Sequence, residues 1–507
     1  MKAVIKAINC RLKSTVNCNS TVIQIILFVI FFSAVRLLQH YTFTNNAFDD
    51  GFNDNIIWNT LHGNFMYSDI KGYMVLGDHL ELANLLFIPF YLLGLGPWIL
   101  YIGQTLIIGL GALPIFWLAK ERIKDERFVF LLPLAYLLYV PTVNITFQGY
   151  YPIALAITPL LFAAYYLIKD KYGWFVFWLF LACLAQENIY LVAAFFGPYI
   201  FFYKKKRLLG GLIFFSGLAA FFLAITVVIP HFNSAGQFAY YGRFAYLGKT
   251  APAMLATLCL RPWTVLPYVV TPDKIWYVLG LFWPLAFLSL RSPAFLLPAL
   301  PILAQNLLTT YREMYQLGSR YPSAIVPFVF LSAIFGLEKV IDRGQSTGHI
   351  RKTLIVFMVL SLLYFFLGWF VRYTAITPSV REGHELLALI PPEASVSALG
   401  NLYPHLCHRK NIWLFPKNWR QADYLMLVKL DPTWPLAGSY DQAFKKLAMD
   451  KNYGKIMEYL FIGETPLPGP LSKAEYPPVF RAITASRDFR TVKDGRCYLL
   501  LKRQSAR

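Results

Sequence analysis

Long apolar runs separated by short basic loops recur over most of this 507-residue chain, for example at 21–39, 97–119 and 208–230. Each run is close to the roughly 20 apolar residues that a membrane-spanning helix needs. Lys and Arg gather in the short loops, as they do on the cytoplasmic side of membranes. With 57% hydrophobic and 15% charged residues, the chain is predicted to be a polytopic α-helical membrane protein. The basic loops explain its net charge of +20, so this charge does not indicate binding to nucleic acid.

The order of the apolar runs predicts about 11 transmembrane helices. The run 21–39 follows a basic N-terminus and has no good cleavage site, which indicates a retained anchor with the N-terminus inside the cell. Loops 40–81 and 231–274 then face outward. Residues 174–203 are too short for two ordinary spans and predict a short hairpin with Glu187 at its apex. An ionisable side chain at that depth is either functional or paired with an arginine or a helix end.

From residue 372 the apolar runs become short and are separated by Pro, Asn and charged turns. This change predicts two domains, a transmembrane domain at 1–371 and an extracytoplasmic α/β domain at 372–507. The segment 439–450 is helix-like, and the end of the chain predicts a hairpin about Asp494-Gly495. The six cysteines lack metal or redox spacing, and only Cys407 and Cys497 could form a disulfide.

Acidic residues gather in the outer stretch 48–81. It holds six of the fifteen that precede residue 372, namely Asp49, Asp50, Asp54, Asp69, Asp78 and Glu81. If 48–59 is helical, Phe48, Phe52 and Ile56 form one row, and Asp50 and Asp54 lie on the opposite side. From amphipathicity alone, a solvated loop in which the aspartates act as caps is favoured over this helix. His79 adds an imidazole that titrates near neutral pH.

Several motifs resemble an uncharacterised prokaryotic family of multispan membrane proteins that is grouped with the GT-C glycosyltransferases. They are FDDGFNDNIIWNTLHG, LGDHLELANLLFIP, QENIYLV, SRYPSAIVPF and NLYPHLCHRKNIWLFP, in this order. The positions that match the family pattern are Asp49, Trp58, Asp78, His79 and Glu187. One turn departs from it, because GYYP at 149–152 replaces an acidic-aromatic-His-Pro turn. A ligand role for that histidine therefore does not carry over.

The resemblance implies a GT-C fold in the cell membrane and transfer of a sugar from a polyprenyl-phosphate donor to an extracytoplasmic lipid, glycan or protein. Such transfer needs a carboxylate to take the acceptor proton and cations to hold the departing phosphate. Asp49 is the expected base, with Asp50 as the near alternative. Arg243 and Arg320, the latter beside Tyr321, are the expected phosphate ligands, although arginines that snorkel to headgroups look the same. Asp50 and Asp54 are candidate ligands for a divalent cation, Mg²⁺ or Mn²⁺.

Two other classes of protein stay open. A lipid or glycan transporter or flippase would show internal repeats and polar residues within its spans, whereas here no clear repeat is visible and the acids gather in an outer loop. A non-catalytic membrane receptor or assembly protein would work through its C-terminal domain and would tolerate substitution of Asp49. In every case the expected partners include membrane lipids and exclude nucleic acid.

Overall fold

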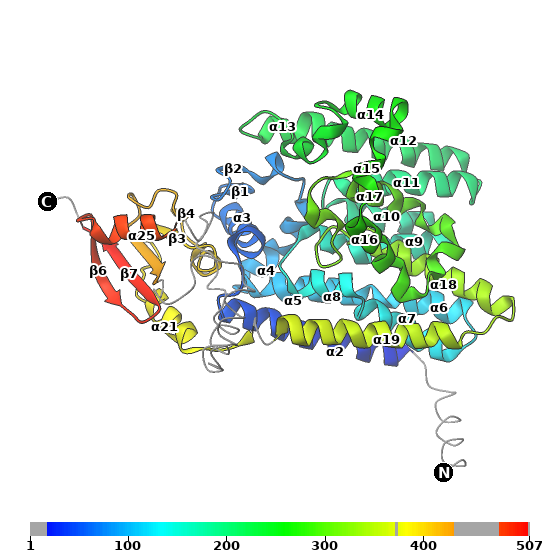
Figure 1. The fold of residues 1–507 in the computed structure, drawn as a ribbon, viewed down its shortest axis with the longest axis horizontal. Helices are drawn as coiled ribbons and strands as arrows, with labels where there is room; N and C mark the ends of the chain where they lie inside the picture. The colour runs from blue at the N-terminus through cyan, green and yellow to red at the C-terminus, as the bar shows by residue number, and fades with distance from the viewer. Residues whose placement is uncertain (1–17, 371–373, 430–475, 505–507) are drawn as a thin grey trace, which may run out of the picture. The chain divides into compact units, whose positions relative to one another are not determined.

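The computed structural model describes residues 18–370, 374–429 and 476–504, which form two compact units (Figure 1). The first unit takes in the chain up to Ser33, Val75–Pro89 and Ile99–Leu363. The second takes in Ala34–Met74, Phe90–Trp98 and the chain from Tyr364 onward. This division differs from the predicted boundary after residue 371. The reason is that Phe43 and Ala47, from the loop 40–81, are buried in the same apolar core as the C-terminal sheet.

Helices dominate the first unit. Five stretches among the described residues are long and apolar enough to cross a membrane, and they are Cys18–Tyr41 (α2), Trp98–Arg122 (α5 and α6), Glu126–Phe147 (α7 and α8), Arg207–Phe232 (α12 to α13) and Gly348–Phe370 (α19 and η12). Shorter apolar helices cover Leu82–Leu92, Pro152–Ile168, Tyr172–Cys183, Asn188–Phe202 and Pro293–Leu308. The predicted polytopic class is confirmed, while the total of about 11 spans stays a prediction.

The first unit also contains many individual shorter helices, some of which make up the apolar segments Leu82–Leu92, Pro152–Ile168 and Pro293–Leu308. Their bounds are η2 Val75–Gly77, η3 Leu82–Phe87, α4 Ile88–Leu92, η4 Pro152–Ala156, α9 Ile157–Ile168, η6 Ala239–Leu247, α14 Ala251–Leu260, η7 Pro262–Thr264, α15 Leu266–Val269, α16 Pro272–Phe282, η8 Trp283–Leu285, η9 Leu288–Arg291, η10 Pro293–Ala299, α17 Leu300–Leu308, η11 Arg312–Tyr315 and α18 Val326–Asp342. The predicted hairpin consists of α10 (Tyr172–Cys183) and α11 (Asn188–Phe202), with Glu187 between them.

Glycines let α11 and α12 (Arg207–Leu223) approach each other closely (Figure 1). A Cβ atom on Gly210 would lie 2.7 Å from the carbonyl oxygen of Gly197, and one on Gly197 would lie 2.5 Å from that of Gly210. Gly217 meets the backbone of Ala194 at 2.7 Å in the same way. Small residues at a helix contact are typical of membrane proteins, because they bring two backbones within van der Waals distance.

A five-stranded mixed sheet is the centre of the second unit, in the order β4-β3-β5-β7-β6. Its strands are β3 Val396–Ala398, β4 Ile412–Leu414, β5 Tyr424–Val428, β6 Phe489–Asp494 and β7 Tyr498–Arg503, with helices α21 Pro378–Leu387, α22 Tyr403–Leu406 and α25 Tyr476–Ala485. β3 pairs in parallel with β4 and β5, and β7 pairs antiparallel with β5 and β6. The predicted hairpin at the chain end is confirmed, whereas 439–450 lies outside the described residues.

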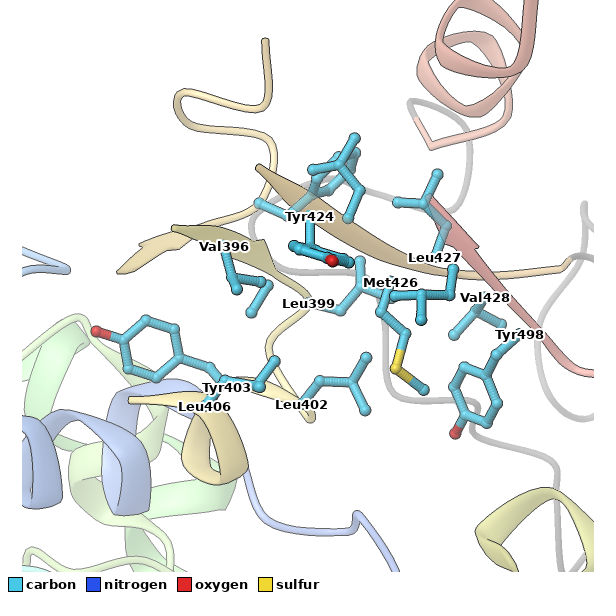
Figure 2. Close-up of a cluster of buried hydrophobic side chains, with 14 of the residues drawn as sticks. Val396, Leu399, Leu402, Tyr403, Leu406, Tyr424, Met426, Leu427, Val428 and Tyr498 are labelled. Atoms are coloured by element: carbon cyan, nitrogen blue, oxygen red, sulfur yellow. The ribbon is translucent and has the colours of Figure 1, made fainter. Parts of the chain in front are cut away.

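The burial of each strand agrees with its position in the sheet. Every residue of the central strand β5 is buried, as the uninterrupted apolar run YLMLV predicts for a strand covered on both faces. Figure 2 shows its side chains beside those of Val396, Leu402 and Tyr403, which come from β3 and the segment around α22. The edge strand β6 is exposed after its first residue and carries the charged side chains. The sheet therefore has one apolar centre and a polar edge.

The segment 47–61 is helical. The solvated loop that amphipathicity alone favoured is therefore wrong, and the helical alternative is confirmed. The loop 40–81 forms η1 (Ala47–Gly51), α3 (Phe52–Leu61) and a short hairpin of β1 (Tyr67–Ser68) and β2 (Tyr73–Met74). Asn46 caps the helical segment, because its Oδ1 accepts hydrogen bonds from the backbone N–H of Phe48 and Asp49 at 2.9 and 3.0 Å. Asp50 and Asp54 are each only 1% exposed. Phe48 departs from the expected buried row and is 54% exposed.

Candidate functional site

The first unit brings together six of the predicted site residues, which are Asp78, His79, Glu187, Arg243, Arg320 and Tyr321. We call this group, with Glu81 and Tyr240, the carboxylate–arginine site. Its residues come from four separate segments of the chain. These are the stretch after η2, the turn before α11, the segment around η6 and the stretch after η11. The site therefore depends on long-range packing.

His79 and Glu187 form a buried ion pair. The Glu187 carboxylate is fully buried, accepts a hydrogen bond from His79 Nδ1 at 2.7 Å and accepts another from the backbone N–H of Leu80 at 3.0 Å. Burial alone lowers the pKa of His79, but the charge and hydrogen bond of Glu187, with help from Asp78 and Glu81, raise it to about 9. His79 is thus a cation at neutral pH. Glu187 is paired with polar groups, as expected for an acid that does not face lipid.

Glu81 is a site residue that sequence reasoning missed. It is 7% exposed, and Gln186 Nε2 donates a hydrogen bond to its Oε1 at 3.3 Å. Burial raises the pKa of Glu81 to about 7, with smaller opposing effects from His79 and Arg320 and further raising by Asp78 and Glu187. Its available signal was its place in the acidic stretch. A carboxyl group that titrates near neutral pH is suited to proton transfer.

Tyr240 links the acids to the arginines and was also missed. Its hydroxyl donates a hydrogen bond to Asp78 Oδ1 at 2.7 Å, and its ring stacks on the His79 ring with centroids 4.8 Å apart. Burial and the neighbouring Asp78 raise the pKa of Tyr240, so the phenol stays protonated. The Arg243 guanidinium also lies over the Tyr240 ring, 4.2 Å from its centroid. The only signal in the sequence was the aromatic-rich outer segment 231–274.

Tyrosines hold both arginines. Arg243 Nη1 donates a hydrogen bond to the Tyr321 hydroxyl at 3.2 Å, and its guanidinium lies 4.5 Å from the Tyr311 ring centroid. Arg320 lies 5.2 Å from the Tyr321 ring and 5.0 Å from that of Tyr151. Tyr151 belongs to the turn that departs from the family pattern, so this turn supplies an aromatic platform for a cation. The site carries fixed positive charge next to buried acids, and can therefore bind an anion close to a proton acceptor.

The second unit holds the other predicted residues, and each aspartate of α3 and η1 has its own partners. Asp49 is half-buried, and its Oδ2 accepts a hydrogen bond from Asn46 Nδ2 at 2.8 Å. Asp50 is buried against the guanidinium of Arg36, whose Nη1 also donates to Gln39 Oε1 at 2.7 Å. Asp50 is thus engaged in an ion pair. The divalent cation expected from the sequence at Asp50 and Asp54 stays a prediction.

Asp54 lies in a polar cluster with residues from distant parts of the chain. Its carboxylate accepts hydrogen bonds from Tyr91 Oη at 2.7 Å, His408 Nε2 at 2.7 Å and Cys407 Sγ at 3.1 Å. Burial by itself raises the pKa of Asp54, but the His408 charge and these hydrogen bonds hold it below its usual range. Trp58 stacks on His62 with centroids 3.9 Å apart and lies 6.2 Å from the His408 ring. The disulfide considered for Cys407 and Cys497 is not formed.

Solved structures of ArnT from Cupriavidus metallidurans are similar to this chain. The structure bound to undecaprenyl phosphate has a TM-score of 0.42 and 11% sequence identity, and the match covers 93% of this chain and 97% of that one. The apo structure has a TM-score of 0.43 and 12% identity over the same shares.

No curated protein matches the chain. The family described as Predicted membrane protein (DUF2079) matches residues 39–459, which is most of the sequence and includes the outer loop, the hairpin of Glu187 and the segment of α22. The resemblance to a family of multispan membrane proteins is therefore confirmed, and the chain belongs to the DUF2079 family of predicted membrane proteins.

Proposed function

We propose that this chain is a membrane glycosyltransferase that moves a sugar from a polyprenyl-phosphate-linked donor to an acceptor outside the cytoplasm. The observation that supports it most is the carboxylate–arginine site, in which Arg243 and Arg320 are held by tyrosines near Glu81 and the His79–Glu187 pair. Paired guanidinium groups are the usual ligands of a phosphate, and a carboxylate is the usual acceptor of a hydroxyl proton.

The reaction follows from these roles. An acceptor hydroxyl attacks the anomeric carbon of the sugar, the bond from that carbon to the phosphate oxygen breaks, and the electron pair leaves with the polyprenyl phosphate. Arg243 and Arg320 stabilise the charge that grows on the phosphate. The acceptor proton passes to a carboxylate. Asp78, His79 and Glu187 then position the donor and the arginines.

Two carboxylates are candidates for the base. The family resemblance assigns the role to Asp49, which is half-buried in the second unit. Glu81 is the candidate within the first unit, because its pKa of about 7 suits a group that takes and releases a proton near neutral pH. Removal of a general base typically lowers the rate by about 10² to 10⁴. The two assignments are therefore separable by substitution.

We predict that Asp49→Asn lowers transfer by about 10² or more while leaving expression and detergent-solubilised folding unchanged, since the change is nearly isosteric. The measurement is the rate of sugar transfer by purified protein, once comparison of envelope lipids and glycoproteins from cells with and without it has named the product. Glu81→Gln is measured in parallel. A loss confined to Glu81→Gln moves the base to the first unit, and full rates in both variants reject the catalytic assignment.

Binding of the donor lipid provides a separate test. Arg243→Ala should weaken binding of polyprenyl phosphate at least about tenfold, because a partly buried charge-assisted contact to phosphate is lost. Arg261→Ala is the matched control, since Arg261 lies in the same outer segment and is exposed. Equal affinities for the two variants would contradict the phosphate role. Binding without transfer of any sugar would favour a lipid transporter instead.

A further inference from the structure

Three potential metal ligands of different type meet in the second unit. Asp54 comes from α3, whereas Cys407 and His408 directly follow α22, and their ligand atoms all lie within 4.8 Å of one another. Asp54 Oδ1 is 2.7 Å from His408 Nε2, and Asp54 Oδ2 is 3.1 Å from Cys407 Sγ. Two of the three side chains are buried, and His408 is 38% exposed. An ion at this point would be bound by the buried Asp54 and Cys407 and would be accessible to solvent on the side of His408.

The donor atoms select the class of ion. A thiolate, an imidazole nitrogen and a carboxylate oxygen together are typical of Zn²⁺ and related first-row ions, while Mg²⁺ and Ca²⁺ prefer oxygen alone. Tetrahedral zinc sets its ligand atoms roughly 3 to 4 Å apart, because the bonds are about 2.0 to 2.3 Å long. The atoms here need to move by no more than roughly 1 Å to reach that arrangement. Three protein ligands leave the fourth position open to water or a bound molecule.

Neighbouring groups hold these ligands in place. Tyr91 Oη donates a hydrogen bond to Asp54 Oδ1 at 2.7 Å, and Asn55 Nδ2 donates one to the carbonyl oxygen of Cys407 at 3.1 Å. Asn55 follows Asp54 on α3, so this bond ties the two ligand segments together. Such supporting hydrogen bonds orient the ligands of metal sites and increase their affinity.

We propose that Asp54, Cys407 and His408 form a site for one zinc-class divalent ion with an open fourth position. The ion takes the place of two protons, one from His408 Nε2 and one from the Cys407 thiol, and both are released to water. It joins α3 to the segment after α22, which lie 353 residues apart in the sequence. This set replaces the Asp50 and Asp54 pair expected from the sequence and favours zinc over magnesium or manganese. The inference does not depend on the glycosyltransferase proposal.

Cobalt provides the test, because a cobalt–thiolate bond gives a charge-transfer absorption that shows sulfur ligation directly. Full-length protein in detergent is treated with a chelator, exchanged into buffer and titrated with CoCl₂, and the bound cobalt is then displaced with ZnCl₂. We expect one Co²⁺ per chain with the thiolate band, and loss of the band when Zn²⁺ is added. Cys407→Ser should abolish the band. His408→Ala should lower the affinity by more than the roughly 10- to 100-fold that loss of a supporting group costs.

Cys497→Ser is the matched control, since Cys497 is a thiol of the same unit outside the cluster. It should bind cobalt as the unmodified protein does. Size-exclusion profiles and circular dichroism establish that each variant is folded, and half-exposed His408 supplies a second variant if Cys407→Ser is unstable. Absence of saturable cobalt binding, or a thiolate band that survives in Cys407→Ser, would overturn the proposal. The cluster would then be an ion pair of Asp54 and His408 with a neutral thiol beside it.

Discussion

At the scale of single residues, buried charge is the most informative feature of this protein. Glu187, Asp50 and Asp54 are each 1% exposed or less, and each lies against a cationic partner, His79, Arg36 and His408 respectively. A buried charge without such a partner costs several kcal/mol, so these pairs stabilise their own surroundings only while both members are charged. The protonation of His79, whose pKa is raised in the folded protein, is therefore linked to folding.

The His79–Glu187 pair gives a pH-dependent prediction. The pKa of His79 is raised to about 9 in the folded protein from 6.5, so its contribution to stability is complete below about pH 6.5 and is lost as pH rises through 9. Glu187→Gln removes the main raising charge and should lower the imidazole pKa by at least about 1 unit. The measurement is nitrogen NMR of labelled histidine together with thermal unfolding at pH 6.5 and pH 10.

At pH 6.5 the unmodified protein should have the higher unfolding temperature, because His79 and Glu187 are both charged. At pH 10 this advantage should be lost, because His79 is neutral and the buried Glu187 charge has lost its cationic partner. His62→Ala identifies the resonance of another, exposed histidine and should leave the His79 titration unchanged. A His79 midpoint that is the same with and without Glu187 would show that the pair does not set this pKa.

At the scale of elements, the contact of α11 with α12 depends on glycine. Gly210 and Gly211 are neighbours on α12, yet a Cβ at Gly210 meets the Gly197 carbonyl at 2.7 Å whereas one at Gly211 meets nothing within 4 Å. The difference follows from helix geometry, because adjacent residues point about 100° apart around the axis. The two positions therefore form a matched pair for testing whether these helices pack as described.

We predict that Gly210→Val destabilises the protein by about 1 to 3 kcal/mol, the usual cost of overpacking, while Gly211→Val changes it little. The apparent melting temperature in detergent is the measurement, with fluorescence-detected size exclusion as a check on assembly. Equal melting temperatures for the two variants would mean that the helices do not meet at Gly210.

At the scale of the whole molecule, orientation in the membrane is the main property still to be tested. The asymmetry of basic loops predicts a cytoplasmic N-terminus and an extracytoplasmic C-terminal region, with an odd number of spans. The five long apolar stretches and the shorter apolar helices are compatible with several total numbers of membrane spans. The prediction tested here therefore concerns the side of the membrane on which each end of the chain lies.

A periplasmic reporter such as alkaline phosphatase, fused after residue 400, should be active, and the same reporter in the basic loop 203–207 should be inactive. A cytoplasmic reporter should give the opposite pattern. If only the cytoplasmic reporter were active after residue 400, the predicted orientation would be reversed. The outer position assigned to the carboxylate–arginine site would then also be wrong.

Local pattern alone establishes the membrane class, the apolar helices, the hairpin at Asp494-Gly495 and the acid-rich segment 48–81. These features depend on neighbouring residues, and hydrophobic periodicity or turn chemistry reports them directly. The sequence also singles out Asp78, His79, Glu187, Arg243 and Arg320, but as separate candidates. Their convergence could not be read from it.

Which groups meet depends on the folded chain. His79 pairs with Glu187 across 108 residues and Asp54 with His408 across 354, distances at which no periodic pattern carries information. The roles of Glu81 and Tyr240 were missed for the same reason, since burial and a long-range neighbour give each its altered pKa. The partner of each buried charge, and so the chemistry open to it, is set by tertiary packing, because desolvation makes an unpaired charge costly wherever the fold encloses it.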